Sequence, residues 1–255
     1  MSRICIFAAS KMEVRPVLDL TRPNVAAGLP APGATLRLGP NELTLIVSGM
    51  GPQLARKTGA ETLSTWIDQD GYERVSGGKP DAVLVIGLCG GLMQPLPRSR
   101  LVLYGGCLSS AGEPRLDCAP AITSRLAQLL GSGGMTCERV IGITSPRIAV
   151  TRADRLTLAA SGAGVVDMES YEFLAAAERA RVPAAVLRVV SDSIDSTLPD
   201  FNDALNADGA LDGRKAFRVA LGSPVQTFRL LAHNKQAMRE LAAALTIVLG
   251  ADLTG

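Results

Sequence analysis

The chain has 255 residues, a length that fits one large α/β domain better than two small ones. Hydrophobic residues make up 47% and charged residues 20%, as in ordinary soluble enzymes with a sizeable core. The formal net charge of +2, without runs of like charge, argues against a protein that binds nucleic acid.

Cysteine and histidine usage limits the metal and redox chemistry. The chain has five cysteines, none in C-x-x-C spacing, and a single histidine, His233. A zinc site and a disulfide framework are therefore not expected. The most apolar stretch, residues 82–93, is shorter than the roughly 20 residues that a membrane span needs. We expect a cytoplasmic protein with reduced thiols, no transmembrane segment, and neither a metal nor a redox cofactor.

Predicted strands and helices alternate along the chain. The expected strands are residues 4–9, 43–47, 82–86, 101–104, 138–143 and 184–190, with another strand ending at 165–166. The expected helices are residues 11–20, 52 to about 69, 120–130, 152–160, a segment from about 168 that stops before 182, and most of the chain from about 203, broken at 222–224. Residues 21–40 are expected to form a loop or a weak pair of strands. We expect one domain over residues 1–255, with a C-terminal helical extension from about residue 200.

Such alternation favours an α/β sheet between layers of helices. In these sheets, ligands gather beyond the carboxyl ends of the strands. The residues that follow the predicted strands therefore hold the candidate polar groups. They are Glu13, Ser48, Cys89, Asp167, Glu169, Ser191 and Asp192.

Two glycine-containing segments invite comparison with phosphate-binding loops. Residues 51–58 lack the glycine that a P-loop needs where Arg56 stands, so we reject a nucleoside triphosphatase. Residues 87–91 follow a strong strand and either let the backbone approach a ligand or form a tight turn; both interpretations are equally supported. Cys89 within them is expected to be a small buried apolar residue, because His233 lies far away in the chain.

Two acid-bearing segments follow later strands. Asp167 and Glu169 stand at a predicted strand-to-helix junction, where helix capping would by itself explain both acids. Arg188 lies among apolar residues two positions before the end of the strand at 184–190, which Ser191 and Asp192 follow, so it needs a buried partner. As neighbouring strands of a βαβ unit, the two segments would face one crevice, together with Glu13.

These patterns resemble the nucleoside phosphorylase and nucleosidase superfamily, especially its methylthioadenosine/S-adenosylhomocysteine nucleosidase branch. Four segments carry the resemblance in order: residues 8–14, 49–63, 83–92 and 165–192. The last is the most specific, with Val-Asp-Met-Glu-Ser and Arg-Val-Val-Ser-Asp separated by one helix. The resemblance implies a three-layer αβα fold around a central mixed twisted sheet. It also implies a homodimer or larger homo-oligomer that acts on a small nucleoside.

On the base side, the resemblance assigns Asp192 as the general acid. Cleavage of the N-glycosidic bond leaves an oxocarbenium-like sugar and an anionic purine, and a carboxylic acid near N7 neutralises the purine. Asp192 must then be held protonated, which burial favours. Ser191 would orient it, and Cys89 and Gly90 would contact the substrate.

On the sugar side, the resemblance implies that Glu169 accepts hydrogen bonds from the ribose hydroxyls and that Met168 packs on the face of the sugar. Glu13 would orient or deprotonate an attacking water, with Arg188 nearby. Water is the preferred nucleophile because Glu13 is present, and the expected function is hydrolysis that releases adenine.

The chain departs from the family pattern at three places. Leu88 stands where nucleosidases commonly carry a small hydroxyl residue, and residues 99–100 replace the usual Gly-Asp. Residues 85–86 are Val-Ile, where phosphorylases usually place an arginine before the glycine segment. Phosphate as a co-substrate is the alternative, with Arg188 or Arg147 as its cation. A catalytically silent nucleoside-binding protein is the alternative from another class, favoured by Leu88.

The C-terminal part carries a second resemblance. Residues 195–199, Asp208-Gly209 and residues 222–224 are similar to segments of hopanoid-associated phosphorylases. Those relatives are thought to remove adenine from adenosylhopane. This resemblance implies that an adenosylhopane-like nucleoside is among the expected substrates.

Overall fold

The computed structural model describes residues 1–21, 35–64, 79–206 and 211–254. The strands are β1 (Ser2–Ala8), β2 (Thr35–Leu38), β3 (Asn41–Val47), β4 (Ala82–Gly91), β5 (Leu101–Ser109), β6 (Leu116–Asp117), β7 (Cys137–Thr144), β8 (Val165–Asp167) and β9 (Ala184–Asp192). The helices are α1 (Lys11–Thr21), α2 (Pro52–Ser64), α3 (Pro120–Ser132), α4 (Arg152–Ala159), α5 (Ser170–Arg179), α6 (Gly213–Gly222) and α7 (Pro224–Leu249), with a 3₁₀ turn at Asn202–Ala204.

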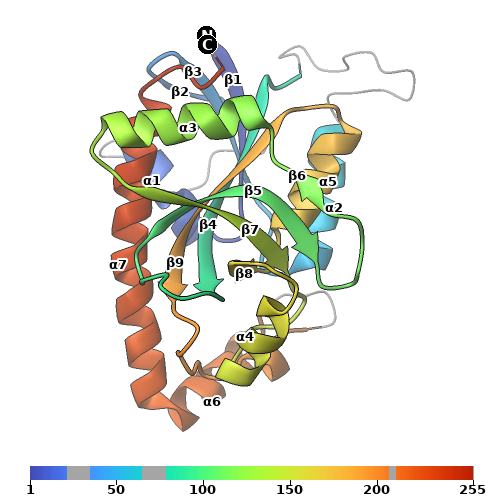
Figure 1. Ribbon diagram of the computed structural model, residues 1–255, viewed down its shortest axis with the longest axis vertical. Coiled ribbons are helices and arrows are strands. Elements are labelled where there is room, and N and C mark those ends of the chain that lie inside the picture. The colour runs from blue at the N-terminus through green and yellow to red at the C-terminus, as the bar shows by residue number, and fades with distance from the viewer. Residues whose placement is uncertain (22–34, 65–78, 207–210, 255) are drawn as a thin grey trace.

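Helices cover both faces of one mixed sheet (Figure 1). Helices α1, α3 and α7 pack on one face, where Val14, Leu126 and Leu241 belong to one apolar cluster. Helices α2 and α5 pack on the other face, where Phe173 stacks on Phe7 of β1 with ring centroids 4.5 Å apart. The apolar faces of these helices have no other place to be buried, which fixes three layers. The predicted αβα fold is confirmed.

The sheet brings several strand ends to one edge. Its order is β2-β3-β1-β4-β8-β7-β5-β6, and β9 pairs with both β4 and β5. Strands β1, β3 and β9 run parallel to β4 or to its neighbour, so their carboxyl ends lie together. This edge is where ligands are expected in such sheets.

The central strand β4 is longer than predicted. The prediction ended it at residue 86 and placed a turn or ligand loop at the glycines, but β4 continues to Gly91. At Gly90 a Cβ would lie 2.9 Å from the guanidinium of Arg155 and 3.1 Å from the carboxylate of Asp192. The glycines therefore make room for charged side chains beside a hydrogen-bonded strand. The tight-turn interpretation is wrong.

The prediction that the two acid-bearing strands are parallel neighbours is also wrong. Strand β8 pairs antiparallel with Gly90-Gly91 of β4, whereas β9 pairs along the other edge of β4. A strand therefore lies between them. The acids still reach one region, because both strands end beside the carboxyl end of β4.

The C-terminal region is helical, as predicted, and the break falls between Gly222 and Pro224. Helix α7 belongs to the apolar core through residues such as Leu245 and Val248. The predicted helix end near residue 69, the loop over residues 22–34 and the Asp208-Gly209 pair lie outside the described residues. Within the described part of the chain, no helix has the length and apolar character needed to cross a membrane.

Candidate functional site

One pocket at this edge of the sheet, about 400 Å³ in volume, is lined by each residue to which the family resemblance gave a role in the site. That size is typical of small-molecule sites. The predicted residues in its wall are Glu13, Cys89, Gly90, Met168, Glu169, Arg188, Ser191 and Asp192. Ser48, also selected from the strand ends, is not in the wall; its hydroxyl donates to the carbonyl of Gly49 at 2.6 Å.

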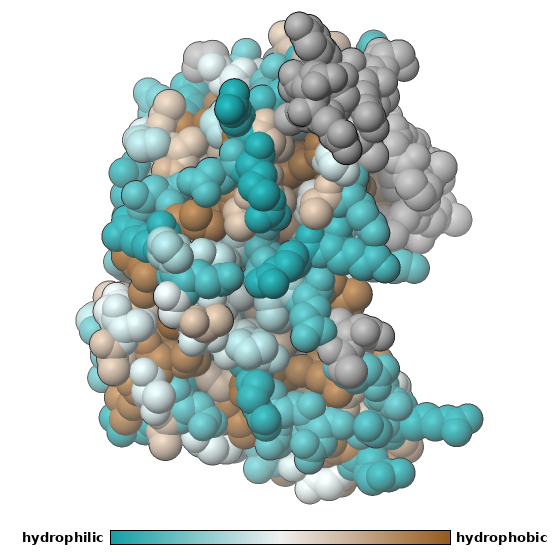
Figure 2. Space-filling model, turned by 90° about the vertical axis from the view of Figure 1, so that its right-hand side faces the viewer, coloured by the Kyte–Doolittle hydropathy of each residue, from teal (hydrophilic) through white to brown (hydrophobic). Residues whose placement is uncertain are grey.

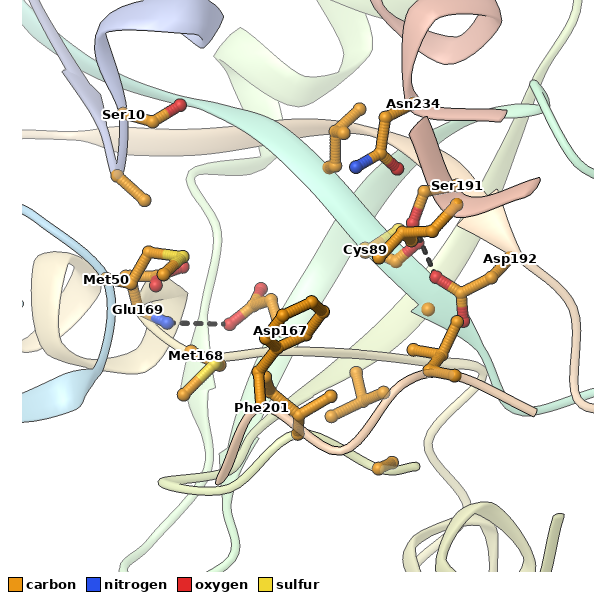
Figure 3. A pocket seen from close by; sticks show the side chains of 18 of the residues that line it. Ser10, Met50, Cys89, Asp167, Met168, Glu169, Ser191, Asp192, Phe201 and Asn234 are labelled. Carbon is orange, nitrogen blue, oxygen red and sulfur yellow. Dashed lines mark hydrogen bonds between the residues drawn. The ribbon is translucent and has the colours of Figure 1, made fainter. Parts of the chain in front are cut away.

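The pocket has two opposed walls (Figure 3). Met168 and Glu169 lie on one side, next to Met50. Ser191 and Asp192 lie on the opposite side with Cys89. A ligand between these walls would therefore meet different chemistry at its two ends.

Glu13 is held in place by backbone amides. It lies in the first turn of α1 and is buried. One oxygen accepts from the N–H of Ser10 at 2.9 Å, and the other accepts from the N–H of Leu88 at 3.1 Å. These donors fix the direction of the carboxylate before any ligand binds.

Gly87 makes this arrangement possible. It has a φ of 147°, a backbone conformation that side chains rarely adopt. A Cβ here would lie 2.6 Å from Nη1 of Arg188 and closer still to the carboxylate of Glu13. Only glycine lets the two charged groups meet over the strand.

We expect Gly87→Ala to lower turnover by about 100-fold or more, because it displaces Glu13 and Arg188 together. Gly112→Ala is the matched control, since Gly112 also has a positive φ, 82°, but no neighbour within 4 Å. Both variants should lose stability by about 1–2 kcal/mol from backbone strain. Steady-state kinetics and thermal melts of the two variants check this; equal activity would contradict the role of Gly87.

Arg188 has the buried partners that its position demanded. Its side chain is about 2% exposed and lies 3.6 Å from Asp167 and 3.5 Å from Glu169. Its guanidinium also donates to Ser170 Oγ at 3.0 Å and to the carbonyl of Leu88 at 3.1 Å. Burial lowers the pKa of Arg188, but the two carboxylates outweigh it and raise the pKa overall. Its charge is therefore permanent and already engaged.

The two acids at the β8–α5 junction have different tasks. Asp167 accepts from the backbone N–H groups of Glu169 and Ser170, and from the hydroxyls of Tyr104 and Thr144. Burial raises its pKa, but Arg188 and these hydrogen bonds lower it further than burial raises it. Asp167 therefore caps α5 and anchors Arg188. Capping, which could have explained both acids, explains only this one.

Glu169 does not cap the helix. Its carboxylate instead accepts from the N–H of Gly51 at 2.9 Å and faces the pocket. Burial raises the pKa of Glu169 from 4.5 to about 7, against the opposing effect of Arg188. It therefore changes charge near neutral pH.

This pKa predicts how stability depends on pH. The folded protein holds the Glu169 proton more tightly than the unfolded chain does. The resulting stabilisation is complete below pH 4.5 and is lost as the pH rises through about 7. Glu169→Gln cannot ionise, so the wild type should lose stability relative to this variant over that interval. Urea unfolding across the interval tests this, with the exposed Glu178→Gln on the same helix as control; parallel curves for wild type and Glu169→Gln would contradict it.

Asp192 has a partner that the sequence did not indicate. One oxygen accepts from Ser191 Oγ at 2.5 Å, and the other forms an ion pair with Nη2 of Arg155. Arg155 is 1% exposed and donates to the carbonyl of Gly91 at 3.3 Å. Burial favours a neutral acid, whereas an arginine stabilises an ionised one. The protonated Asp192 that the resemblance implies therefore stays a prediction, and Arg155 is a partner that the prediction did not include.

No local signal marks Arg155. It lies on α4, where half of the residues are polar and where Arg155 is the buried residue. Apolar periodicity, which identified the other elements, points to no buried face here. Only the docking of α4 beside Gly90 brings Arg155 to Asp192.

Cys89 is buried, and burial raises the pKa of its thiol strongly. Burial therefore disfavours a thiolate nucleophile at this position. Other lining residues were not predicted, among them Met12, Phe201 and Asn234. Oδ1 of Asn234 is buried and has no hydrogen-bond partner among the described residues. It is an acceptor available to a ligand.

Comparison with models of protein families identifies one family. The family model described as the phosphorylase superfamily matches residues 3–220. No curated protein matches the chain.

Many solved structures share the fold. A 5′-methylthioadenosine/S-adenosylhomocysteine nucleosidase from Neisseria meningitidis, in complex with methylthio-immucillin-A, has a TM-score of 0.70 at 13% identity, over 98% of this chain and 99% of that one. The corresponding nucleosidase of Helicobacter pylori has a TM-score of 0.67 at 15% identity, over 96% of both chains. Futalosine hydrolase of Helicobacter pylori has a TM-score of 0.68 at 16% identity, over 97% of both chains.

Proposed function

The chain belongs to the phosphorylase superfamily, and from this we propose that it hydrolyses the N-glycosidic bond of an adenosine-type nucleoside and releases adenine. The observation that carries the proposal is the pair of opposed walls, with Glu169 and Met168 facing Asp192 and Ser191 across one pocket. A nucleoside has a polar sugar and a flat base. The two walls suit these two ends.

In the proposed reaction, the bond between C1′ and the base nitrogen breaks and its electron pair goes to the base. Asp192 gives its proton to N7, so the base leaves as neutral adenine. A water oxygen forms the new bond to C1′, and Glu13 takes the proton that the water loses. The proton held by Glu13 then returns to Asp192 through solvent. Glu169 accepts hydrogen bonds from the ribose hydroxyls.

Arg155 acts on Asp192 both before and after the proton transfer. Proton transfer from Asp192 leaves a buried carboxylate, which is costly without a partner. The guanidinium of Arg155 already contacts that carboxyl group. It offsets the charge of the carboxylate that the transfer leaves, and for the same reason it opposes the protonated form that Asp192 needs before the transfer.

The charges near Arg188 favour water over phosphate as the nucleophile. Its guanidinium is shared by Asp167, Glu169 and the carbonyl of Leu88, while Glu13 lies close by. A phosphate dianion beside Arg188 would lie close to several carboxylates. Among the described residues around Arg188, no lysine or arginine is left without a carboxylate partner to bind it. Arg147 is exposed at the pocket's rim. Phosphorolysis is therefore the second candidate.

The silent-binder alternative rests on Leu88, which lacks a hydroxyl. In this chain the polar contacts at residue 88 come from its backbone, because its N–H donates to Glu13 and its carbonyl accepts from Arg188. These contacts do not depend on the side chain. The substitution therefore gives little support to a loss of activity.

The remaining lining favours an apolar 5′ substituent. Met12, Leu198, Phe201, Leu211 and Leu230 contribute apolar side chains to the pocket. Methylthioadenosine suits such a lining better than S-adenosylhomocysteine, whose amino-acid end is charged. An adenosylhopane-like nucleoside is the most apolar member of the proposed class.

The test is adenine release from methylthioadenosine, S-adenosylhomocysteine and adenosine, with and without phosphate, in EDTA. Release without phosphate supports hydrolysis and ranks the substrates. Release that requires phosphate would replace hydrolysis by phosphorolysis. No release from the three compounds, in a protein that binds them, would favour the silent binder.

A further inference from the structure

Helix α6 meets the start of α7 at one end of the molecule (Figure 1). Exposed apolar side chains lie on both helices there. Phe217 and Leu221 lie one turn apart on α6, and Val225, Phe228 and Leu231 follow on α7. Their exposed fractions run from 59% to 74%. Helix α6 buries none of its residues. Large apolar side chains gathered in this way mark a binding surface.

The same segment is basic throughout. Residues 213–239 contain six exposed lysines and arginines and no aspartate or glutamate, in a chain whose net charge is +2. They are Arg214, Lys215, Arg218, Arg229, Lys235 and Arg239. The residues are not contiguous, so the sequence showed no charge run. Figure 2 shows apolar residues interspersed with hydrophilic ones at this lower end of the molecule.

We propose that α6 and residues 224–239 of α7 form a docking surface for an anionic membrane. Helices that lie in a membrane interface combine aromatic and aliphatic side chains with lysines and arginines. Clusters of four to eight basic residues on such helices bind anionic lipids. Both features coincide here on one pair of helices.

A second copy of the chain fits this surface poorly. A two-fold dimer presents the same patch from both partners, so it would bring the six basic residues of one copy close to the six of the other. No acidic residue in the segment could compensate. An anionic lipid surface accepts both the charge and the apolar side chains.

The surface adjoins the pocket. Leu230 and Asn234 of α7 line the pocket, and Leu211, which precedes α6, lines it as well. Docking would therefore hold the pocket close to the lipid. A ligand with an apolar portion would have a short path between the two.

Sedimentation with vesicles tests the proposal directly. Wild-type protein should sediment with vesicles of phosphatidylcholine and phosphatidylglycerol, and added salt should weaken this binding. Phe217→Ser/Phe228→Ser and Lys215→Glu/Arg218→Glu should each weaken it by tenfold or more. Lys57→Glu/Arg179→Glu, with the same charge change on the exposed side of α2 and α5, is the control and should bind as the wild type does.

Other outcomes would overturn the proposal. One is a lack of sedimentation with anionic vesicles, and another is equal binding of the wild type and both patch variants. Soluble polyglutamate that binds as tightly as vesicles, independently of Phe217 and Phe228, would indicate an acidic protein partner instead. A wild-type dimer that Phe217→Ser/Phe228→Ser dissociates in sedimentation velocity would identify the patch as a subunit interface. Binding to lipid is measured without turnover, so these outcomes do not depend on the enzymatic reaction.

Discussion

Asp192→Asn is expected to lower kcat for base release by about 10²–10⁴-fold, the usual contribution of a general acid. The amide accepts a hydrogen bond from Ser191 but cannot give a proton to the base. KM should change little, because the shape of the pocket wall is kept. Quantifying adenine release by chromatography measures this directly.

The structure adds a stability cost to this variant. Asparagine leaves Arg155 buried without its counter-charge, which typically costs about 3–5 kcal/mol. Asp192→Asn/Arg155→Met removes both charges and should recover most of that stability without recovering activity. If the double variant turned over nucleoside like the wild type, Asp192 would be a structural ion-pair partner and not the acid.

Glu13→Gln is the second large effect that we expect, a loss of about 10²–10⁴-fold in kcat through removal of the base. The loss should appear with water as nucleophile and leave KM nearly unchanged. Asp19→Asn, on the exposed side of the same helix, is the matched control and should behave as the wild type does. Initial rates at saturating nucleoside are the measurement.

Glutamine at position 13 also changes the local hydrogen bonds. Both oxygens of Glu13 accept from backbone N–H groups, at Ser10 and Leu88. The amide N–H₂ of glutamine would meet one of these donors, at a cost of about 1–3 kcal/mol. Thermal melts separate this cost from the chemical one. Full activity in a destabilised Glu13→Gln would show that the carboxylate only orients the backbone.

The five variants at Gly87, Glu169, Asp192, Arg155 and Glu13 separate three kinds of role. Gly87→Ala should displace neighbouring side chains by steric crowding. Glu169→Gln should change the pH dependence of stability, and Asp192→Asn and Glu13→Gln should lower kcat. Arg155 acts through Asp192. The effect of Arg155→Met on kcat should therefore disappear in a protein that already lacks the acid, a non-additivity that a double-mutant cycle measures.

Local patterns in the sequence determined the fold class and the segments that build the site. Apolar runs and alternation predicted the main strands and helices, because burial imposes a period of about two or 3.6 residues on adjacent positions. The strand ends then pointed to polar residues such as Glu13, Glu169 and Asp192. All three line the pocket.

The tertiary structure alone decided how these residues are paired. Arg155 and Asp192 are far apart in the chain, and no periodicity couples them. Asp167 caps α5 and Glu169 faces the pocket because different backbone N–H groups and arginine contacts surround each carboxylate. The length of β4 depends on what lies beside its glycines. Packing between distant segments decides which charged groups come into contact and how closely two segments approach. A pattern of neighbouring residues in the sequence contains no information about either.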